Sequence, residues 1–122
     1  MGIEKAFAIQ ADPAVIWREL IRELAQASPG SHTVERSLEG RELAVRVELQ
    51  RGIEAVITYQ LIPREDHVEV VARMEPQGFR YALLRAITLG RYDLGYELAL
   101  AQGLSNLKEA AEASAGREAS PP

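Results

Sequence analysis

Residues 32–75 read HTVERSLEGRELAVRVELQRGIEAVITYQLIPREDHVEVVARME, and this stretch decides the fold. Apolar and polar residues alternate with period two through four segments, which are separated by short runs containing glycine, proline or aspartate. Such alternation is typical of β-strands that bury one face and expose the other to water. We therefore expect four consecutive antiparallel strands at residues 32–38, 41–49, 53–62 and 67–75.

The connections between these segments set the expected register. A two-residue loop, Glu39-Gly40, places Arg36 opposite Leu43. A three-residue loop ending in Gly52 then places Leu43 opposite Tyr59, because a two-residue loop would turn the next strand inside out. A four-residue loop at residues 63–66 connects the third of these strands to the fourth. All hairpins then share one apolar face, which includes Leu43, Val45, Val47, Ala55, Ile57, Tyr59, Leu61, Val68, Val70, Ala72 and Met74.

A strand and a helix are expected before this stretch. Residues Ile3 to Gln10 alternate, with only Lys5 out of pattern, and predict a first strand. Asp12 is a good N-cap and Pro13 suits the first helical position, so a helix should begin there and end near Ala27.

A long C-terminal helix is expected over residues 79–113, where leucine, alanine and charged residues recur at helical spacing. In its first half, Leu83, Ile87 and Leu94 lie on nearly the opposite side from Leu89, Tyr92 and Tyr96. The helix therefore either breaks near residues 90–95 or is buried on both sides.

Composition limits the classes of protein that are possible. A chain of 122 residues without cysteine accommodates one core and excludes disulfides and cysteine-ligated metals. We expect a single domain at 1–113 and a flexible tail at 114–122. The net charge of −4 disfavours nucleic-acid binding, and no apolar run is long enough to span a membrane. A cytoplasmic protein without cofactor or metal is the resulting expectation.

Two short motifs, in their order along the chain, carry a resemblance to a known superfamily. The first helix opens with Asp-Pro-x-x-Ile-Trp-x-x-Leu, and the last helix closes on Leu-x-x-Leu-Lys-x-x-x-Glu. The matching residues are Asp12, Pro13, Ile16, Trp17, Leu20, Leu104, Leu107, Lys108 and Glu112. With the hairpins between them, they resemble the START-like (SRPBCC) superfamily, the helix-grip group of polyketide cyclases, coenzyme Q-binding proteins and the birch-pollen allergen.

The resemblance implies an α+β helix-grip domain, in which a curved antiparallel sheet wraps a long C-terminal helix in the order β-α-β-β-β-β-α. Family members usually have more than five strands and two short helices after the first strand. A shorter sheet encloses less volume, so a second subunit could close the cavity and a homodimer is possible.

The candidate ligand-binding residues follow from the apolar face and the long helix. They are Arg36, Leu43, Val45, Val47, Ile57, Tyr59, Val70, Ala72, Met74, Leu83, Ile87 and Leu94. Arg36 and Tyr59 are predicted in one cross-strand row, where a guanidinium and a phenol could orient a carboxylate, phosphate or carbonyl. The bland alternative is that Arg36, like His32, reaches around an edge strand to water. Trp17 is expected to fill the core.

Three functions remain open on the sequence. The favoured one is a noncatalytic carrier or binding protein for a hydrophobic small molecule such as a lipid, quinone or polyketide-like aromatic. A cyclase or aromatase-type enzyme is less favoured, because few titratable groups fall on the predicted inner face and no nucleophile or metal motif is present. The third is a protein-interaction module that uses the sheet or the doubly apolar helix.

Overall fold

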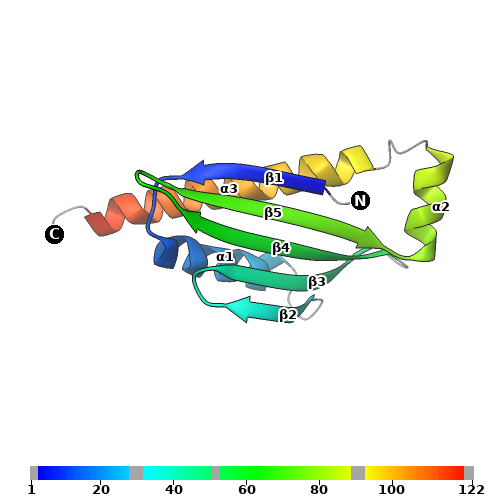
Figure 1. Cartoon of the computed structure of the whole chain (residues 1–122), viewed down its shortest axis with the longest axis horizontal. Coiled ribbons are helices and arrows are strands. Elements are labelled where there is room, and N and C mark those ends of the chain that lie inside the picture. The colour runs from blue at the N-terminus through cyan, green and yellow to red at the C-terminus, as the bar shows by residue number, and fades with distance from the viewer. Residues whose placement is uncertain (1–2, 28–31, 51–52, 89–92, 120–122) are drawn as a thin grey trace.

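The computed structural model describes residues 3–27, 32–50, 53–88 and 93–119, and all numbers below refer to these. One five-stranded antiparallel sheet has the order β1-β5-β4-β3-β2. Helices α1 and α3 cover one face of the sheet, and α2 stands at its end (Figure 1). The elements are β1 (Ile3–Ile9), α1 (Pro13–Ala27), β2 (His32–Leu38), β3 (Glu42–Gln50), β4 (Ile53–Pro63), β5 (Val68–Gln77), α2 (Phe79–Ile87) and α3 (Asp93–Ala119).

The β2–β3 hairpin follows the predicted register only in part. His32 pairs with Val47 as expected, but a bulge beyond Val34 shifts the pairing by one residue, so that Arg36 pairs with Ala44. The cause is the turn, which has three residues between the paired Leu38 and Glu42 instead of the expected two. The bulge absorbs the extra residue and turns Arg36 to the other face of the sheet.

The β3–β4 hairpin has the predicted pairing of Leu43 with Tyr59. Its turn differs, because Gln50 pairs with Ile53 and a register shift after Glu48 restores the apolar face. The predicted left-handed Gly52 lies outside the described residues.

The β4–β5 register predicted from the sequence is wrong by two residues. Pro63 pairs with Val68, so Tyr59 lies opposite Ala72 instead of Val70. The Arg64 amide donates to the His67 carbonyl, which closes the turn one residue later than expected at each end. A shift of two residues preserves the face of every side chain, so the alternation could not reveal it.

The first helix begins and ends as predicted, whereas the C-terminal helical segment differs from a single helix over 79–113. Helix α1 starts at Pro13, where the Asp12 carbonyl accepts the first backbone hydrogen bonds. The C-terminal segment is broken into α2 and α3, which confirms one of the two alternatives, and α3 continues past the expected end at residue 113 to Ala119.

The core lies between the inner face of the sheet, α1 and α3. Its buried side chains come from the sheet and from both helices, and β5 and α3 supply the most. The outer face is polar and is crossed by ion pairs such as Arg46 with Glu54 and Arg73 with Glu4. One wet face and one buried face are what the alternation predicts.

Candidate functional site

Most predicted site residues on the sheet lie on the inner face, under the helices. Leu43, Val45, Val70 and Ala72 are almost completely buried, as are Ile57 and Met74. Val47 is only partly buried and packs against the edge of the core. This wall is apolar, as the sequence predicts.

Tyr59 is the polar member of this wall. Burial, together with the negative charge of Glu23, raises the pKa of its phenol to about 12, so the hydroxyl stays protonated at neutral pH. No hydrogen bond links the Tyr59 hydroxyl to the described part of the chain. Tyr59 can therefore offer its proton, or its oxygen, to another molecule.

Arg36 does not join Tyr59, because the bulge in β2 puts it on the outer face. Its Nε lies 2.9 Å from Glu42 Oε2, and its side chain is mostly exposed. The register from which Arg36 was placed beside Leu43 is wrong. The side chain of His32 lies outside the described residues.

The predicted ligand-binding side chains of the C-terminal segment also face away from the interior. Leu83, Ile87 and Leu94 are 49%, 67% and 58% exposed. Leu83 and Ile87 lie on α2, which stands at the end of the sheet instead of lying across it (Figure 1), and Leu94 lies in the first turn of α3.

Two residues that the sequence interpretation passed over lie on the inner side of α1. With about 100° per residue, Glu19 and Glu23 fall on the same stripe as Ile16 and Leu20. Glu19 is 4% exposed. Burial, and then the charge of Glu19, raise the pKa of Glu23. A helical projection of α1 would have found both, because an acidic residue in the centre of an apolar stripe breaks the pattern.

A third polar group completes an inner band. Lys5 Nζ donates to Glu97 Oε1 over 2.6 Å, which joins β1 to α3. Lys5 pairs with Ala72, which in turn pairs with Tyr59, so the three residues lie side by side across neighbouring strands. We name the group formed by Lys5, Glu97, Tyr59, Glu19 and Glu23 the inner polar band.

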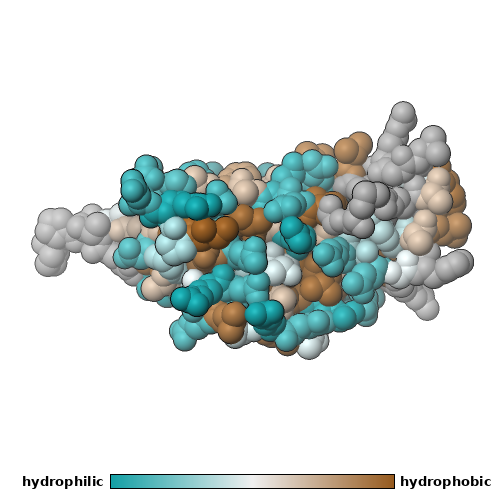
Figure 2. All heavy atoms as spheres, in the orientation of Figure 1, coloured by the Kyte–Doolittle hydropathy of each residue, from teal (hydrophilic) through white to brown (hydrophobic). Residues whose placement is uncertain are grey.

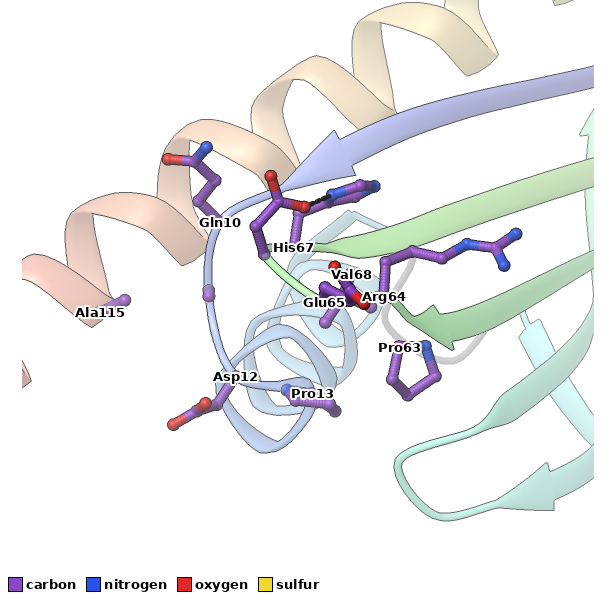
Figure 3. Close-up of a pocket in the computed structure, with 11 residues that line it drawn as sticks. Gln10, Asp12, Pro13, Pro63, Arg64, Glu65, His67, Val68 and Ala115 are labelled. Carbon is purple, nitrogen blue, oxygen red and sulfur yellow. Dashed lines mark hydrogen bonds and ion pairs between the residues drawn. The ribbon is translucent and has the colours of Figure 1, made fainter.

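Several hollows lie at the surface of the described part of the chain, and two of them border helix α1 or its start. One of about 570 Å³ opens between the β1–α1 connection, the β4–β5 turn and α3 (Figure 3). In it, His67 Nδ1 lies 2.6 Å from Asp66 Oδ1, and this hydrogen bond lowers the pKa of Asp66. The two residues are neighbours in sequence on an exposed turn. Their hydrogen bond can therefore stabilise the turn as well as contribute to a binding site.

The second hollow, of about 640 Å³, lies between α1 and the β2–β3 turn. It is lined by Ala14, Trp17, Arg18, Ile21, Glu39 and Gly40. Trp17 packs against the core with one side and borders this groove, in keeping with its expected role as core filler. Among the described residues, no group of three side chains could hold a metal ion.

The architecture matches solved structures, although no protein-family model and no curated protein matches the sequence. The solution structure of the Aha1 dimer from Colwellia psychrerythraea superposes with a TM-score of 0.66 at 16% identity, covering 92% of this chain and 96% of that one. The chain has the helix-grip fold.

Other helix-grip structures agree. A protein from Mesorhizobium loti has a TM-score of 0.65 at 14% identity, over 90% of this chain and 96% of that one. The di-domain ARO/CYC StfQ from the steffimycin biosynthetic pathway has a TM-score of 0.61 at 14% identity, over 97% of this chain and 51% of that one. At these identities, the superpositions show the helix-grip fold and not the activity. No helix in the described part of the chain is long and apolar enough to cross a bilayer.

Proposed function

We propose that this chain binds an apolar small molecule that carries one polar group, in the interior between the sheet, α1 and α3. The apolar wall formed by Leu43, Ile57 and Ala72 would hold the body of the ligand. Tyr59 and Glu23 would contact its polar group.

The observation that carries this proposal is the unpaired state of the Tyr59 hydroxyl. Within the described residues, every completely buried side-chain nitrogen or oxygen has a hydrogen-bond partner. The Tyr59 hydroxyl has no such partner. It must therefore border a space that water or a ligand can enter, even though its surroundings desolvate it. A ligand group placed there would replace the missing hydrogen bond.

We favour binding over catalysis, because binding requires no reactive group beyond those described. A cyclase-type activity is the alternative for the same interior, since one structural neighbour is named ARO/CYC and the raised pKa of Glu23 suits proton transfer. The two roles can be told apart by whether the added compound is changed. A poly-β-carbonyl thioester recovered unchanged after incubation supports binding alone, and a cyclised product supports catalysis.

Thermal melting with 1-decanol, farnesol and menadione, each below its aggregation concentration, tests binding. At least one should raise Tm progressively with concentration, because ligand that binds only the folded state stabilises it by mass action. Tyr59→Phe should weaken the shift produced by the alcohols. Thr58→Val removes a hydroxyl from the opposite face of the same strand and should leave the shift unchanged. No shift with any probe would refute the proposal.

A second candidate role, self-association, rests on a separate feature. The exposed apolar side chains Leu83, Ile87, Leu94 and Leu98 form what we name the end patch, on α2 and the first turns of α3. Figure 2 shows apolar atoms gathered at this end of the molecule. Contiguous exposed apolar surface marks interaction sites, and a structural neighbour is described as a dimer. We propose a second copy of this chain as its occupant.

Native mass spectrometry and light scattering test the dimer. The wild type should be dimeric at micromolar concentration, and the double variant Ile87→Glu, Leu98→Glu should be monomeric. Leu38→Gln replaces another exposed leucine, on the edge strand β2, and should stay dimeric. A monomeric wild type, or dissociation by Leu38→Gln alone, would rule out the end patch as the interface.

A further inference from the structure

We infer that the polar group of the bound molecule is a cation, such as the ammonium of an amphiphilic amine, held between Glu23 and Tyr59. The inference rests on the proposed binding function and narrows its ligand class. It reverses the chemistry expected from the sequence, in which Arg36 would have selected an anionic or carbonyl group. Arg36 lies on the outer face, paired with Glu42.

The first argument is the balance of charge along the inner polar band. The inner polar band contains three carboxylates, from Glu19, Glu23 and Glu97, and one ammonium, from Lys5. The ammonium is engaged by Glu97 at 2.6 Å. The band is therefore negative on its α1 side, where a cation would be attracted and an anion repelled.

The second argument is that Glu23 has no cation of its own. Arg22 Nη1 lies 3.7 Å from Glu19 Oε2, and the Arg22 side chain is 65% exposed. Arg18, on the outer flank of the same helix, donates to Ser114 on α3. Within the described residues, no ion pair or hydrogen bond reaches the Glu23 carboxylate. Glu23 thus lies on the inner stripe of α1 as an unpaired acid.

The unpartnered hydroxyl of Tyr59 is the independent sign that a ligand group belongs at this place. It lies on β4, across the interior from α1, and it is close enough to Glu23 for the carboxylate to affect its ionisation. A neutral phenol can accept a hydrogen bond from an ammonium, and its ring face also attracts cations. A carboxylate on one side and a phenol on the other suit one cationic head. The apolar wall suits the body attached to it.

The charge of Glu23 makes the binding dependent on pH. The charged and titratable groups around it are Glu19 on α1, Arg22 beside Glu19, and Tyr59 on β4. Because burial and the charge of Glu19 raise its pKa, Glu23 becomes protonated at a higher pH than an exposed glutamate does. Protonating Glu23 removes the counter-charge for the ligand, so amine binding should weaken as the pH falls and alcohol binding should not.

Isothermal titration calorimetry with three ten-carbon probes, each below its aggregation concentration, tests the inference on the full chain. Decylamine is protonated at neutral pH, as a lysine side chain is. It should bind about tenfold or more tightly than 1-decanol and decanoate, as expected for a charge-assisted contact. Glu23→Gln should remove this preference while leaving 1-decanol affinity within about twofold.

Two further variants serve as controls. Glu75→Gln changes an exposed carboxylate on the outer face and should leave all three affinities unchanged. Glu19→Gln should reduce the preference for decylamine less than Glu23→Gln does, because Arg22 already offsets part of the Glu19 charge. Circular dichroism confirms that each variant is folded before titration.

The outcomes separate this inference from the function on which it rests. If 1-decanol or decanoate binds as tightly as decylamine, or if Glu23→Gln weakens all probes equally, the cationic class is wrong and the binding function stands. If no probe binds the wild type, the binding function itself fails, and the inference fails with it.

Discussion

The first turns of α3 and the turns that follow carry leucines with opposite surroundings. Leu94 and Leu98, in the first turns, are 58% and 73% exposed, whereas Leu104 and Leu107, further along, are each 1% exposed. The later turns are also tied to β1, because Lys108 Nζ donates to the Ala8 carbonyl over 2.8 Å. The later turns therefore build the core, and the leucines of the first turns face outward. Leucine spacing alone does not reveal which leucines are buried.

The largest expected effect separates the first turns of α3 from the later ones by stability. Leu104→Ala should lower the free energy of unfolding by about 2 to 5 kcal/mol, because it removes buried contacts and leaves a cavity. In the dissociated monomer, Leu98→Ala should change it by less than about 0.5 kcal/mol, because the side chain is there already in water. Chemical denaturation monitored by circular dichroism measures both. Equal losses would show that Leu98 is covered in solution.

A smaller effect concerns the one described ion pair between β1 and the N-terminal half of α3. Lys5→Met should cost about 0.2 to 1 kcal/mol, since the two side chains are 33% and 42% exposed and solvent screens their attraction. The loss should shrink at high salt. A double-mutant cycle with Glu97→Gln measures the coupling. A coupling energy of zero would mean that packing alone holds this half against the sheet.

The smallest effects concern pH, and two carboxylates, Glu112 on α3 and Glu23 on α1, should respond with opposite sign. The Gln10 amide and the Lys108 ammonium lower the pKa of Glu112 in the later turns of α3. Its contribution to stability is therefore present above the unfolded pKa and lost as the pH falls through the folded pKa. Glu112→Gln should be less stable than the wild type at neutral pH, and the gap should close in acid.

Glu23 should behave in the opposite way. Because burial raises its pKa in the folded state, ionising it costs stability, and this cost grows as the pH rises through the folded pKa. Glu23→Gln should then be slightly more stable than the wild type at neutral pH and equal to it in acid. Urea denaturation at a series of pH values measures both variants. A Glu23→Gln variant that is less stable at neutral pH would indicate a partner for this carboxylate in the folded protein.

Much of the architecture was predictable from residues alone. The period-two pattern identified the strands and the inner face, including the inward orientation of Tyr59, and the Asp12-Pro13 signal located the start of α1. These features are local, because alternation and capping act over a few residues. The break between α2 and α3 was one of two alternatives. Apolar residues on both sides of the segment were equally compatible with a broken helix and with one helix buried on both sides.

The candidate site was predictable only on the sheet. Glu19 and Glu23 were visible as acids in an apolar stripe. The proximity of Glu23 to Tyr59, however, depends on how α1 crosses the sheet. The same holds for Lys5, whose departure from alternation gains a meaning only when Glu97 meets it. Contacts between residues 92 positions apart have no signature in one sequence.

The sequence by itself determined which side chains face inward along β3, β4 and β5, because a side-chain period of two allows only two faces. The tertiary structure decided the rest. A three-residue turn and one bulge moved Arg36 to the outer face, and a two-residue slip moved Tyr59 from Val70 to Ala72. Neither change disturbs the apolar pattern beyond a single strand end, so hydrophobic burial does not distinguish the alternatives. Hydrogen bonding of the turns and packing of the helices select between them, and those energies exist only in the folded molecule.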